Sequence, residues 1–349
     1  MSGRQLHEWF AIGGTVHASS PAAPADDPRD SFANSNLRLA FSGAGLRDCE
    51  FILAACGGHG DYSGNEVTSI DLAEEAPVWR LRASSSGASV IAQDVAHYRD
   101  GKPSSRHTYW STHYSTTLSR LMLHRSRFVY GRGVSFDATN GFDLSTNTWD
   151  VAGTWKDGFS SGCRDAYDNV WALTDFGQTL MKWTAATDMW TVAGTFSADG
   201  PGYPMAHDSR RDQLFALSWG NGEGSSSGLR AAKFTAHGSV QTSVTFGASE
   251  GLNALQAAQP SYAAMEYDPQ NDCFYFYAGT AGEEGRIYVI TPNSGTTWSV
   301  AIAALRAGSA MPAPIGPNGV CSRFRYVSAL RGCVLMVDGT NPLYFIRTG

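Results

Sequence analysis

An internal repeat constrains the fold of this sequence more than any other feature. A polar turn, a short apolar strand and then glycine recur six times. The expected strands cover residues 48–53, 126–130, 168–173, 212–217, 272–277 and 332–337. Continuous apolar runs of this length, bounded by turn residues, are typical of strands buried on both faces. The repetition predicts an all-β fold built from one supersecondary unit, with these runs as its inner strands.

Glycine follows each predicted strand, where a chain leaving a crowded centre needs a residue without a Cβ. These glycines are Gly57 with Gly58, Gly131, Gly177, Gly220, Gly279 and Gly339. A second element follows in most copies and consists of an apolar strand, a polar turn and a tryptophan. It is clearest at residues 141–149, and related segments end at Trp79, Trp190 and Trp298.

In these two elements the sequence resembles the kelch family of β-propellers, whose repeat joins a double glycine to a downstream aromatic residue and tryptophan. The first copy matches best, from Gly57 and Gly58 to Trp79. The resemblance covers about residues 37–349. It implies a six-bladed, kelch-like β-propeller.

The two ends of the chain are expected to close this propeller together. The sixth copy ends at residues 344–347 and lacks the tryptophan, whereas Leu6–Ile12 carries Trp9. Because an open last blade would expose a sheet edge, we expect the N-terminal strand to complete it. Residues 19–35 are rich in Pro, Ala, Ser and Asp and predict an extended linker. The predicted organisation is therefore a closing strand with a linker at 1–36, followed by the propeller at 37–349.

Composition limits the partners and the compartment. The net charge of −6 argues against direct nucleic-acid binding, and the sequence contains no long apolar run that would predict membrane insertion. The N-terminal residues do not resemble a signal peptide, so we expect a cytoplasmic protein or one incorporated in a virion. The six cysteines form no CxxC pair and are expected to be reduced core residues. Three of them, Cys49, Cys273 and Cys333, fall at the same predicted repeat position, which favours packing.

Motifs for catalysis or metal binding are weak. His59 and Asp61, with neighbouring Tyr62, are loop candidates, and His107 with His113 could add imidazole nitrogens. Ligand spacing on loops is unconstrained, so the sequence predicts neither a metal site nor a cofactor. A phosphate-binding loop and a dinucleotide fingerprint are absent from the sequence. We therefore expect no catalytic residues and no enzymatic activity.

Charge is segregated along one segment. From Lys102 to Arg132 the chain carries six Lys or Arg residues and three histidines without an Asp or Glu, and aromatic residues are interleaved with them. Such a loop could present cations beside aromatic rings to an anionic partner. The predicted partner-binding residues are Arg106, His107, Tyr109, Trp110, His113, Tyr114 and Arg132. In the alternative interpretation the arginines only protect strand edges from pairing.

The predicted function is a protein-binding or structural assembly module, since recognition by rigid repeat folds is placed in their loops. The longest predicted loops are near residues 83–106, 220–228, 247–260 and 307–318. The expected partners are protein subunits of a larger assembly, such as a phage tail hub or nozzle. The alternative is a carbohydrate-binding lectin, or a kelch-like enzyme, with its site at the mouth of the central pore.

Overall fold

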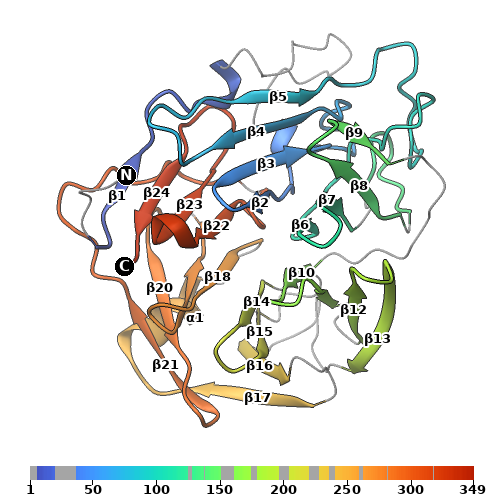
Figure 1. Cartoon of the computed structure of the whole chain (residues 1–349). Coiled ribbons are helices and arrows are strands. Elements are labelled where there is room, and N and C mark those ends of the chain that lie inside the picture. Colours follow the sequence, from blue (N-terminus) through green and yellow to red (C-terminus); the bar gives the residue numbers. More distant parts are fainter. Residues whose placement is uncertain are drawn as a thin grey trace.

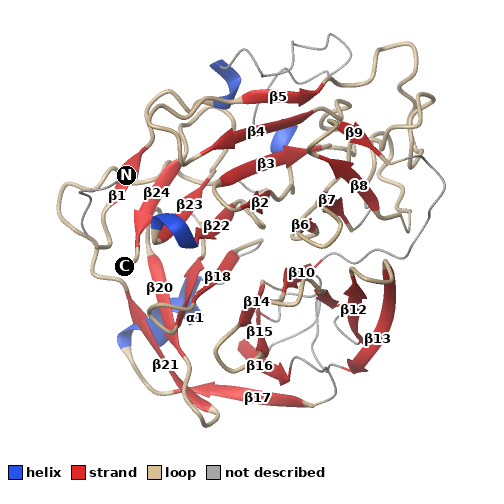
Figure 2. Cartoon of the chain, viewed as in Figure 1, coloured by secondary structure: helices blue, strands red, loops and turns tan. Residues whose placement is uncertain are grey.

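The protein is an all-β structure. The computed structural model describes residues 6–19, 37–124, 128–136, 138–150, 161–173, 179–195, 204–219, 228–235, 240–258, 262–280, 282–316 and 318–349. These residues contain twenty-four β-strands, one α-helix and three short 3-10 helices, η1 (His17–Ser19), η2 (Leu37–Leu39) and η3 (Ser328–Leu330) (Figure 2). No helix within the described part of the chain is long and apolar enough to span a membrane.

Four sheets are four-stranded and antiparallel throughout. The first contains β2 (Gly45–Arg47), β3 (Glu50–Ala54), β4 (Val67–Asp71) and β5 (Arg80–Ala83). The second contains β6 (Thr112–Ser115), β7 (Arg120–Leu123), β8 (Asn140–Asp143) and β9 (Thr148–Trp149). The third contains β10 (Ser161–Arg164), β11 (Val170–Leu173), β12 (Thr179–Thr184) and β13 (Met189–Thr195). The fourth joins the two ends of the chain and contains β22 (Phe324–Val327), β23 (Gly332–Leu335), β24 (Tyr344–Arg347) and β1 (Trp9–Ala11).

The remaining sheet has eight strands and consists of two antiparallel four-stranded runs. One run contains β14 (Met205–Asp208), β15 (Gln213–Trp219), β16 (Leu229–Thr235) and β17 (Gln241–Phe246). The other contains β18 (Ala264–Asp268), β19 (Cys273–Tyr277), β20 (Ile287–Thr291) and β21 (Thr297–Ile302). A short parallel pairing of β17 with β21 joins the runs. Helix α1 (Glu250–Ala258) lies between them in sequence, so the predicted loop at 247–260 is largely helical.

The sheets are arranged around a common centre. In Figure 1 the first strand of each four-stranded run lies near the middle, and the fourth lies at the periphery. The first strands contact one another in the pairs β2 with β6, β10 with β14, β14 with β18, and β18 with β22. Apolar cores fill the spaces between neighbouring sheets or runs. For example, the ring of Phe215 on β15 lies 4.9 Å from Phe274 and 4.6 Å from Trp298 in the next run.

The turn before the second strand is the local structure behind the repeat. In all six runs this turn contains a residue with positive φ, and the six residues are Asp48, Ser119, Asp168, Asp212, Asp272 and Arg331. Aspartate adopts this left-handed conformation more readily than most residues. In the turn after β18, the Asp268 carboxylate also accepts the backbone N–H groups of Gln270 and Asn271. The polar turn of the repeat therefore encodes a hairpin.

Five of the six predicted apolar strands coincide with strands of the structure: β3, β11, β15, β19 and β23. They are second in their runs, so each is an inner strand with a neighbour on both sides, as predicted, and the first strand of each run lies closer to the centre (Figure 1). The second copy is misplaced, because β7 begins at Arg120, directly after the positive-φ residue Ser119. Of the predicted strand, Phe128 has positive φ and its carbonyl accepts the N–H of His59. Of the glycines expected after the strands, Gly177 and Gly220 lie outside the described residues.

The N-terminal strand completes the C-terminal sheet, which confirms the predicted pairing. Strand β1 is antiparallel to β24, with Trp9 opposite Ile346. The Trp9 indole donates a hydrogen bond to the carbonyl of Gly285 at 2.7 Å, and its ring lies 6.1 Å from Tyr277 in the neighbouring run. The predicted linker, apart from Ser19, and the predicted loop at 220–228, apart from Gly228, lie outside the described residues.

All six cysteines are free thiols, as predicted, and all except Cys49 are buried. Burial raises the pKa of Cys56 to about 11 and that of Cys273 to about 12, so both thiols are protonated at neutral pH. The shared repeat position holds for Cys49 and Cys273, which directly follow a positive-φ turn residue. Cys333 lies one residue further along its strand, because Gly332 follows Arg331.

Candidate functional site

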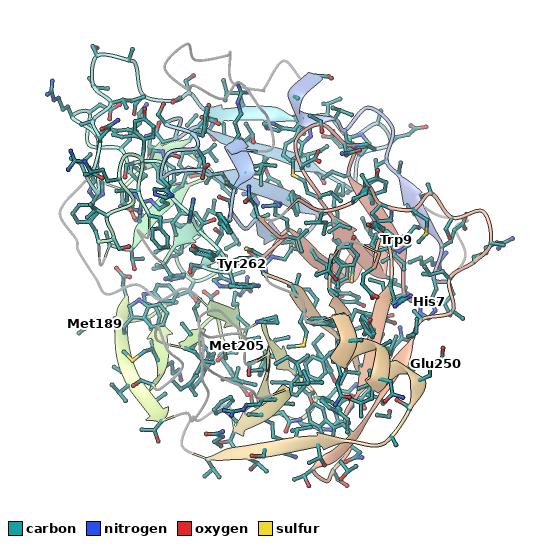
Figure 3. The ribbon with its side chains drawn as sticks, turned by 180° about the vertical axis from the view of Figure 1, so that it is seen from behind. His7, Trp9, Met189, Met205, Glu250 and Tyr262 are labelled. Carbon is teal, nitrogen blue, oxygen red and sulfur yellow. The ribbon has the colours of Figure 1, made fainter. Side chains whose placement is uncertain are left out.

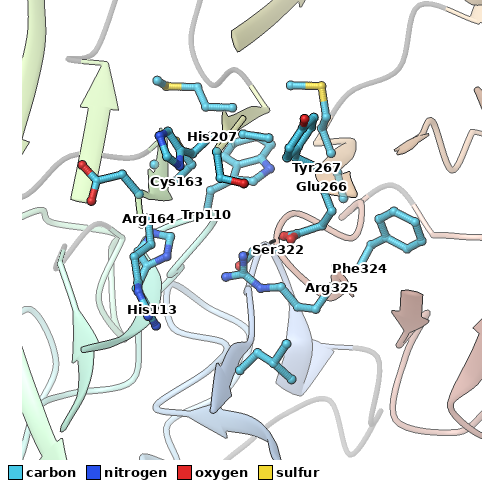
Figure 4. Close-up of a pocket in the computed structure, with 18 of the residues that line it drawn as sticks. Trp110, His113, Cys163, Arg164, His207, Glu266, Tyr267, Ser322, Phe324 and Arg325 are labelled. Carbon is cyan, nitrogen blue, oxygen red and sulfur yellow. Dashed lines mark hydrogen bonds and ion pairs between the residues drawn. The ribbon is translucent and has the colours of Figure 1, made fainter. Parts of the chain in front are cut away.

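A cavity of about 300 Å³ is lined by the first strand of every four-stranded run (Figure 4). Its lining includes Leu46 on β2, His113 on β6, Cys163 on β10, His207 on β14, Glu266 on β18 and Arg325 on β22. Because these strands are far apart in the sequence and near the centre of Figure 1, the cavity is central to the fold. Sites of this kind, concave and made from several elements, are where small ligands bind most often.

One repeat position supplies much of the lining. Two residues before the end of each first strand stand Gly45, His113, Gly162, Ala206, Glu266 and Arg325. All of these except Gly45 line the cavity. At this position β10 and β14 carry only glycine and alanine, whereas β6 carries an imidazole and β18 and β22 carry charged groups. The backbone of the repeat is therefore regular, whereas the side chains at this position differ in chemistry from one copy to the next.

Arg325 is the most highly connected of these residues. Its guanidinium donates to the Glu266 carboxylate at 2.9 Å, to the carbonyl of Ala44 just before β2, and to the carbonyl of Thr112 on β6 at 2.8 Å. Burial raises the pKa of Glu266, although the charge and hydrogen bond of Arg325 oppose this. Since 21% of the Glu266 side chain and 13% of the Arg325 side chain stay exposed, the pair can still contact a ligand.

The opposite wall holds a second arginine and two histidines. Arg164 contacts the carboxylate of Asp168 at 3.1 Å and donates to the carbonyl of Tyr114 at 2.6 Å. Burial, with Arg325 and other cations nearby, lowers the pKa of His113 well below its usual value, so this imidazole is neutral at pH 7. Its Nε2 atom is buried without a hydrogen-bond partner among the described residues. His207 is held by Asp212 at 3.1 Å.

Trp110 adds a rigid aromatic surface. Its indole donates to the carbonyl of Ala263 at 2.8 Å, which sets the orientation of the ring. The rings of Tyr109 and Tyr262 stack with it at centroid distances of 6.2 Å each. The cavity thus combines an apolar face with an ion pair, and Trp110 is the only one of these three aromatic residues in its lining.

The predicted partner-binding surface is wrong in one respect, because most of its side chains are not exposed. Arg106, His107, Tyr109, Trp110, His113 and Tyr114 are buried, and only Arg132 is exposed. Arg106 donates to the carbonyls of Ser104 and Ala96 and to the side-chain oxygen of Asn140, and burial lowers its pKa to about 9. A guanidinium can be buried in this way when carbonyl oxygens accept its N–H groups. Trp110, His113 and Tyr114 instead line the cavity.

The loop candidates lie outside the cavity lining. His59 is exposed, whereas Asp61 is half-buried and lies beside the buried His107. Tyr62 is buried, donates a hydrogen bond to Glu66 at 3.1 Å, and packs under the guanidinium of Arg38 at 5.3 Å. Tyr62 is therefore a packing residue of this turn.

Sequence analysis missed the charged residues of the cavity, Arg164, Glu266 and Arg325. A signal was present, since Glu266 and Arg325 each have an apolar or aromatic residue on either side within their first strands. Comparing the residues at this repeat position in all six copies would have identified both charged residues. Comparison with models of known protein families found no match, and comparison with curated proteins found no similar sequence. The resemblance to kelch repeats therefore stays a prediction.

Proposed function

We propose that this chain is a six-bladed β-propeller that acts as a binding module and accepts a small, hydroxyl-rich ligand of the sugar class in its central cavity. The observation that carries the proposal is the cavity lined by all six first strands, with the Glu266–Arg325 pair inside it. The six antiparallel four-stranded runs and the pairing of β1 with β24 support the propeller architecture.

The chemistry of the lining supports this ligand class. A sugar hydroxyl can donate to the Glu266 carboxylate and accept from the Arg325 guanidinium, while the C–H face of a sugar ring packs on an aromatic ring such as Trp110. The cavity volume of about 300 Å³ lies at the small end of the range for ligand pockets. We therefore expect one or two sugar units rather than a long chain.

Binding is favoured over catalysis because the carboxylates and arginines of the lining already have partners. Glu266 is paired with Arg325, and His207 with Asp212. The Asp165 carboxylate accepts hydrogen bonds from backbone N–H groups and from the indole of Trp171. Groups held in this way orient a ligand more readily than they transfer its protons.

The proposal is tested with neutral and acidic mono- and disaccharides, using thermal shift and calorimetry on the full chain. We expect one ligand class to bind at one equivalent and Glu266→Gln to weaken it at least about tenfold, since a charged hydrogen bond contributes roughly 1.5–3 kcal/mol. Glu74→Gln is the matched control, because Glu74 forms an ion pair with Arg80 outside the cavity. Absence of binding across the panel, or equal binding by both variants, would contradict the proposal.

Strand β13 favours a second candidate, a docking site for a protein subunit of a larger assembly. Among the described residues it pairs only with β12, and its Met189 and Val192 side chains are 57% and 68% exposed. Figure 3 shows Met189 at the periphery of the molecule. An exposed, partly apolar edge strand is a template for strand addition by a partner. If this is the function, Val192→Lys should abolish co-purification of the partner from native material and leave the melting temperature unchanged.

A further inference from the structure

Three potential metal ligands, two from one turn and one from a neighbouring segment, converge beside a group of aromatic rings that includes Phe41, Tyr109 and Phe128. The donor atoms of His59, Asp61 and His107 all lie within 4.8 Å of one another, and they form the only such group among the described residues. We propose that these residues bind one divalent transition-metal ion of the Zn²⁺ type. This proposal replaces the sequence-based prediction of no metal site and is independent of the proposed sugar-binding function.

Two glycines bring the loops together. Gly57 and Gly58 have φ values of +90° and +84°, and a Cβ on Gly58 would lie 2.5 Å from the Cα of Arg106. The turn can therefore sit directly on the segment that carries His107. Its shape is held by hydrogen bonds from Asp61 N–H to the Gly58 carbonyl and from Gly58 N–H to the Tyr62 carbonyl. The double glycine thus allows this turn to pack directly against the segment that carries His107.

A third loop fixes the position of His59. The N–H of His59 donates to the carbonyl of Phe128 at 2.9 Å, and the carbonyl of His59 accepts the N–H of Gly131 at 2.7 Å. A Cβ on Gly133 would lie 2.7 Å from the imidazole of His59, so this loop can approach the ring only because position 133 is glycine. The candidate site joins turns from the first and second sheets.

The geometry of Asp61 and His107 fits a metal ion without rearrangement. Nε2 of His107 lies 3.2 Å from Oδ2 of Asp61. Two ligand atoms bound to one tetrahedral Zn²⁺, at roughly 2.0–2.2 Å each, are about 3.4 Å apart. The ligand atom of His59 already lies within 4.8 Å of the other two, so a small adjustment of its exposed side chain completes a three-ligand site, and a fourth position stays open for water.

The surroundings of His107 orient it as a ligand. Its Nδ1 lies 3.3 Å from the hydroxyl of Tyr109, so each ring nitrogen has its own contact. The rings of Phe41 and Phe128 pack on the imidazole at centroid distances of 4.7 and 5.4 Å. Outer groups of this kind hold a histidine ligand in one orientation and raise its affinity for metal.

The choice of ion follows from the ligand types. Imidazole nitrogens with one carboxylate suit Zn²⁺ and neighbouring transition metals, whereas Ca²⁺ and Mg²⁺ prefer oxygen ligands. The pair His207 and Asp212 provides an internal comparison. Its imidazole and carboxylate are 3.1 Å apart, nearly the same separation, but it has no third ligand among the described residues. A contact between one histidine and one aspartate is therefore not sufficient for the proposed metal site, which also requires a third ligand.

The test uses the full, untagged chain after treatment with a chelator. We expect Zn²⁺ to bind at one equivalent in calorimetry and to raise the melting temperature, because an ion that binds only the folded state stabilises it. His59→Gln and Asp61→Asn should each weaken Zn²⁺ binding at least about tenfold. Tyr109→Phe should weaken it roughly 10–100-fold by removing the group that orients His107. His207→Gln is the matched control and should bind Zn²⁺ as the wild type does.

His59 and Asp61 are exposed or half-buried, so their variants are expected to fold, and melting curves without metal check this. Three results would overturn the proposal: no binding of Zn²⁺ by the stripped wild-type chain, equal binding by folded His59→Gln and Asp61→Asn, or loss of binding in His207→Gln alone. Binding that disappears in His59→Gln and Asp61→Asn and persists in the control would establish the site.

Discussion

Two places in the molecule join segments that are distant in sequence, and they differ in how deeply they are buried. We call the pairing of Trp9–Ala11 with Tyr344–Arg347 the closure seam, and the pairing of residues 245–246 with 297–298 the outer joint. Trp9 and Phe10 in the seam are buried, whereas the joint combines the buried Trp298 and the half-buried Phe246 with the exposed Thr245 and Thr297. The seam is antiparallel and the joint is a short parallel contact.

A buried arginine reinforces the connection between the first sheet and the C-terminal sheet. Arg323 donates to the carbonyls of Leu39 and Ser42, which precede the first sheet, and to those of Gly319, Met336 and Val337. The outer joint has no comparable residue among those described; its side-chain contacts include Thr245 with Thr297 at 3.1 Å. The difference indicates that the seam contributes to the stability of the whole fold, whereas the joint is a local contact.

Removing the seam should have the largest effect. Deletion of residues 1–13 exposes the edge of β24 and removes the buried side chains of Trp9, Phe10 and Ile12. We expect loss of cooperative thermal unfolding and aggregation, measured by calorimetry and light scattering. An unchanged melting profile would show that the seam does not stabilise the fold.

A single substitution makes the comparison more specific. Trp9→Ala should lower the free energy of unfolding by about 3–5 kcal/mol, the usual cost of truncating a buried tryptophan. The matched variant at the joint is Phe246→Ala, where the side chain is half-buried, and we expect a loss of roughly 1 kcal/mol. Urea denaturation measures both. Equal losses would remove the distinction between seam and joint.

Lowering the pH should reduce the free energy of unfolding through His17, a residue in the region of the seam. Burial, followed by the nearby charge of Arg38, lowers the pKa of His17 to about 4 from 6.5. The unfolded chain therefore binds a proton first as the pH falls below 6.5, and the folded state loses stability progressively down to about pH 4. At pH 5 this loss is about 2 kcal/mol from His17.

The measurement is urea denaturation at several pH values for the wild type and His17→Gln. The wild type should lose more stability than the variant between pH 7 and 5, because glutamine does not titrate. Parallel pH profiles would contradict the assignment to His17. The four residues of the outer joint carry no group that titrates in this range, so variants there should keep the pH profile of the wild type.

The smallest effect is expected from the side-chain contact at the joint. Thr245→Ala removes the exposed hydroxyl contacts with Thr296 and Thr297 and should change the free energy of unfolding by less than about 0.5 kcal/mol. A loss above about 2 kcal/mol would show that the joint couples the two runs as strongly as the seam couples the termini.

Some of the fold could be predicted from the sequence because its signals are local. Asp212 and Asp272 adopt positive φ directly before a buried strand, and Asp168 does so with one residue between it and the strand. Each of the three marks a hairpin. Trp9 indicated the seam, since the sixth copy lacked a tryptophan. The second copy was misassigned because residues 121–123 and 128–130 are both short and apolar, and only the hairpin at Ser119 distinguishes them.

The residues of the candidate sites could not be predicted correctly, because their positions depend on contacts between segments that are distant in the sequence. Arg106 lies in a segment without acidic residues, which predicted an exposed basic surface, yet carbonyl oxygens and Asn140 accept its hydrogen bonds in the interior. The net charge of a segment does not determine its burial, because backbone carbonyls and amide oxygens can accept the hydrogen bonds of a buried guanidinium.

By itself, the sequence determined the β-class of the fold and five of the six predicted strands, because turn chemistry and apolar runs act between neighbouring residues. It also indicated the pairing of the two ends, because Trp9 supplies the tryptophan that the sixth copy lacks. Only the tertiary structure decided which side chains meet. Glu266 and Arg325 are 59 residues apart, and His107 and Asp61 are 46 apart. Their contacts arise from the way successive sheets and turns are placed around the centre, and sequence spacing carries no record of that placement.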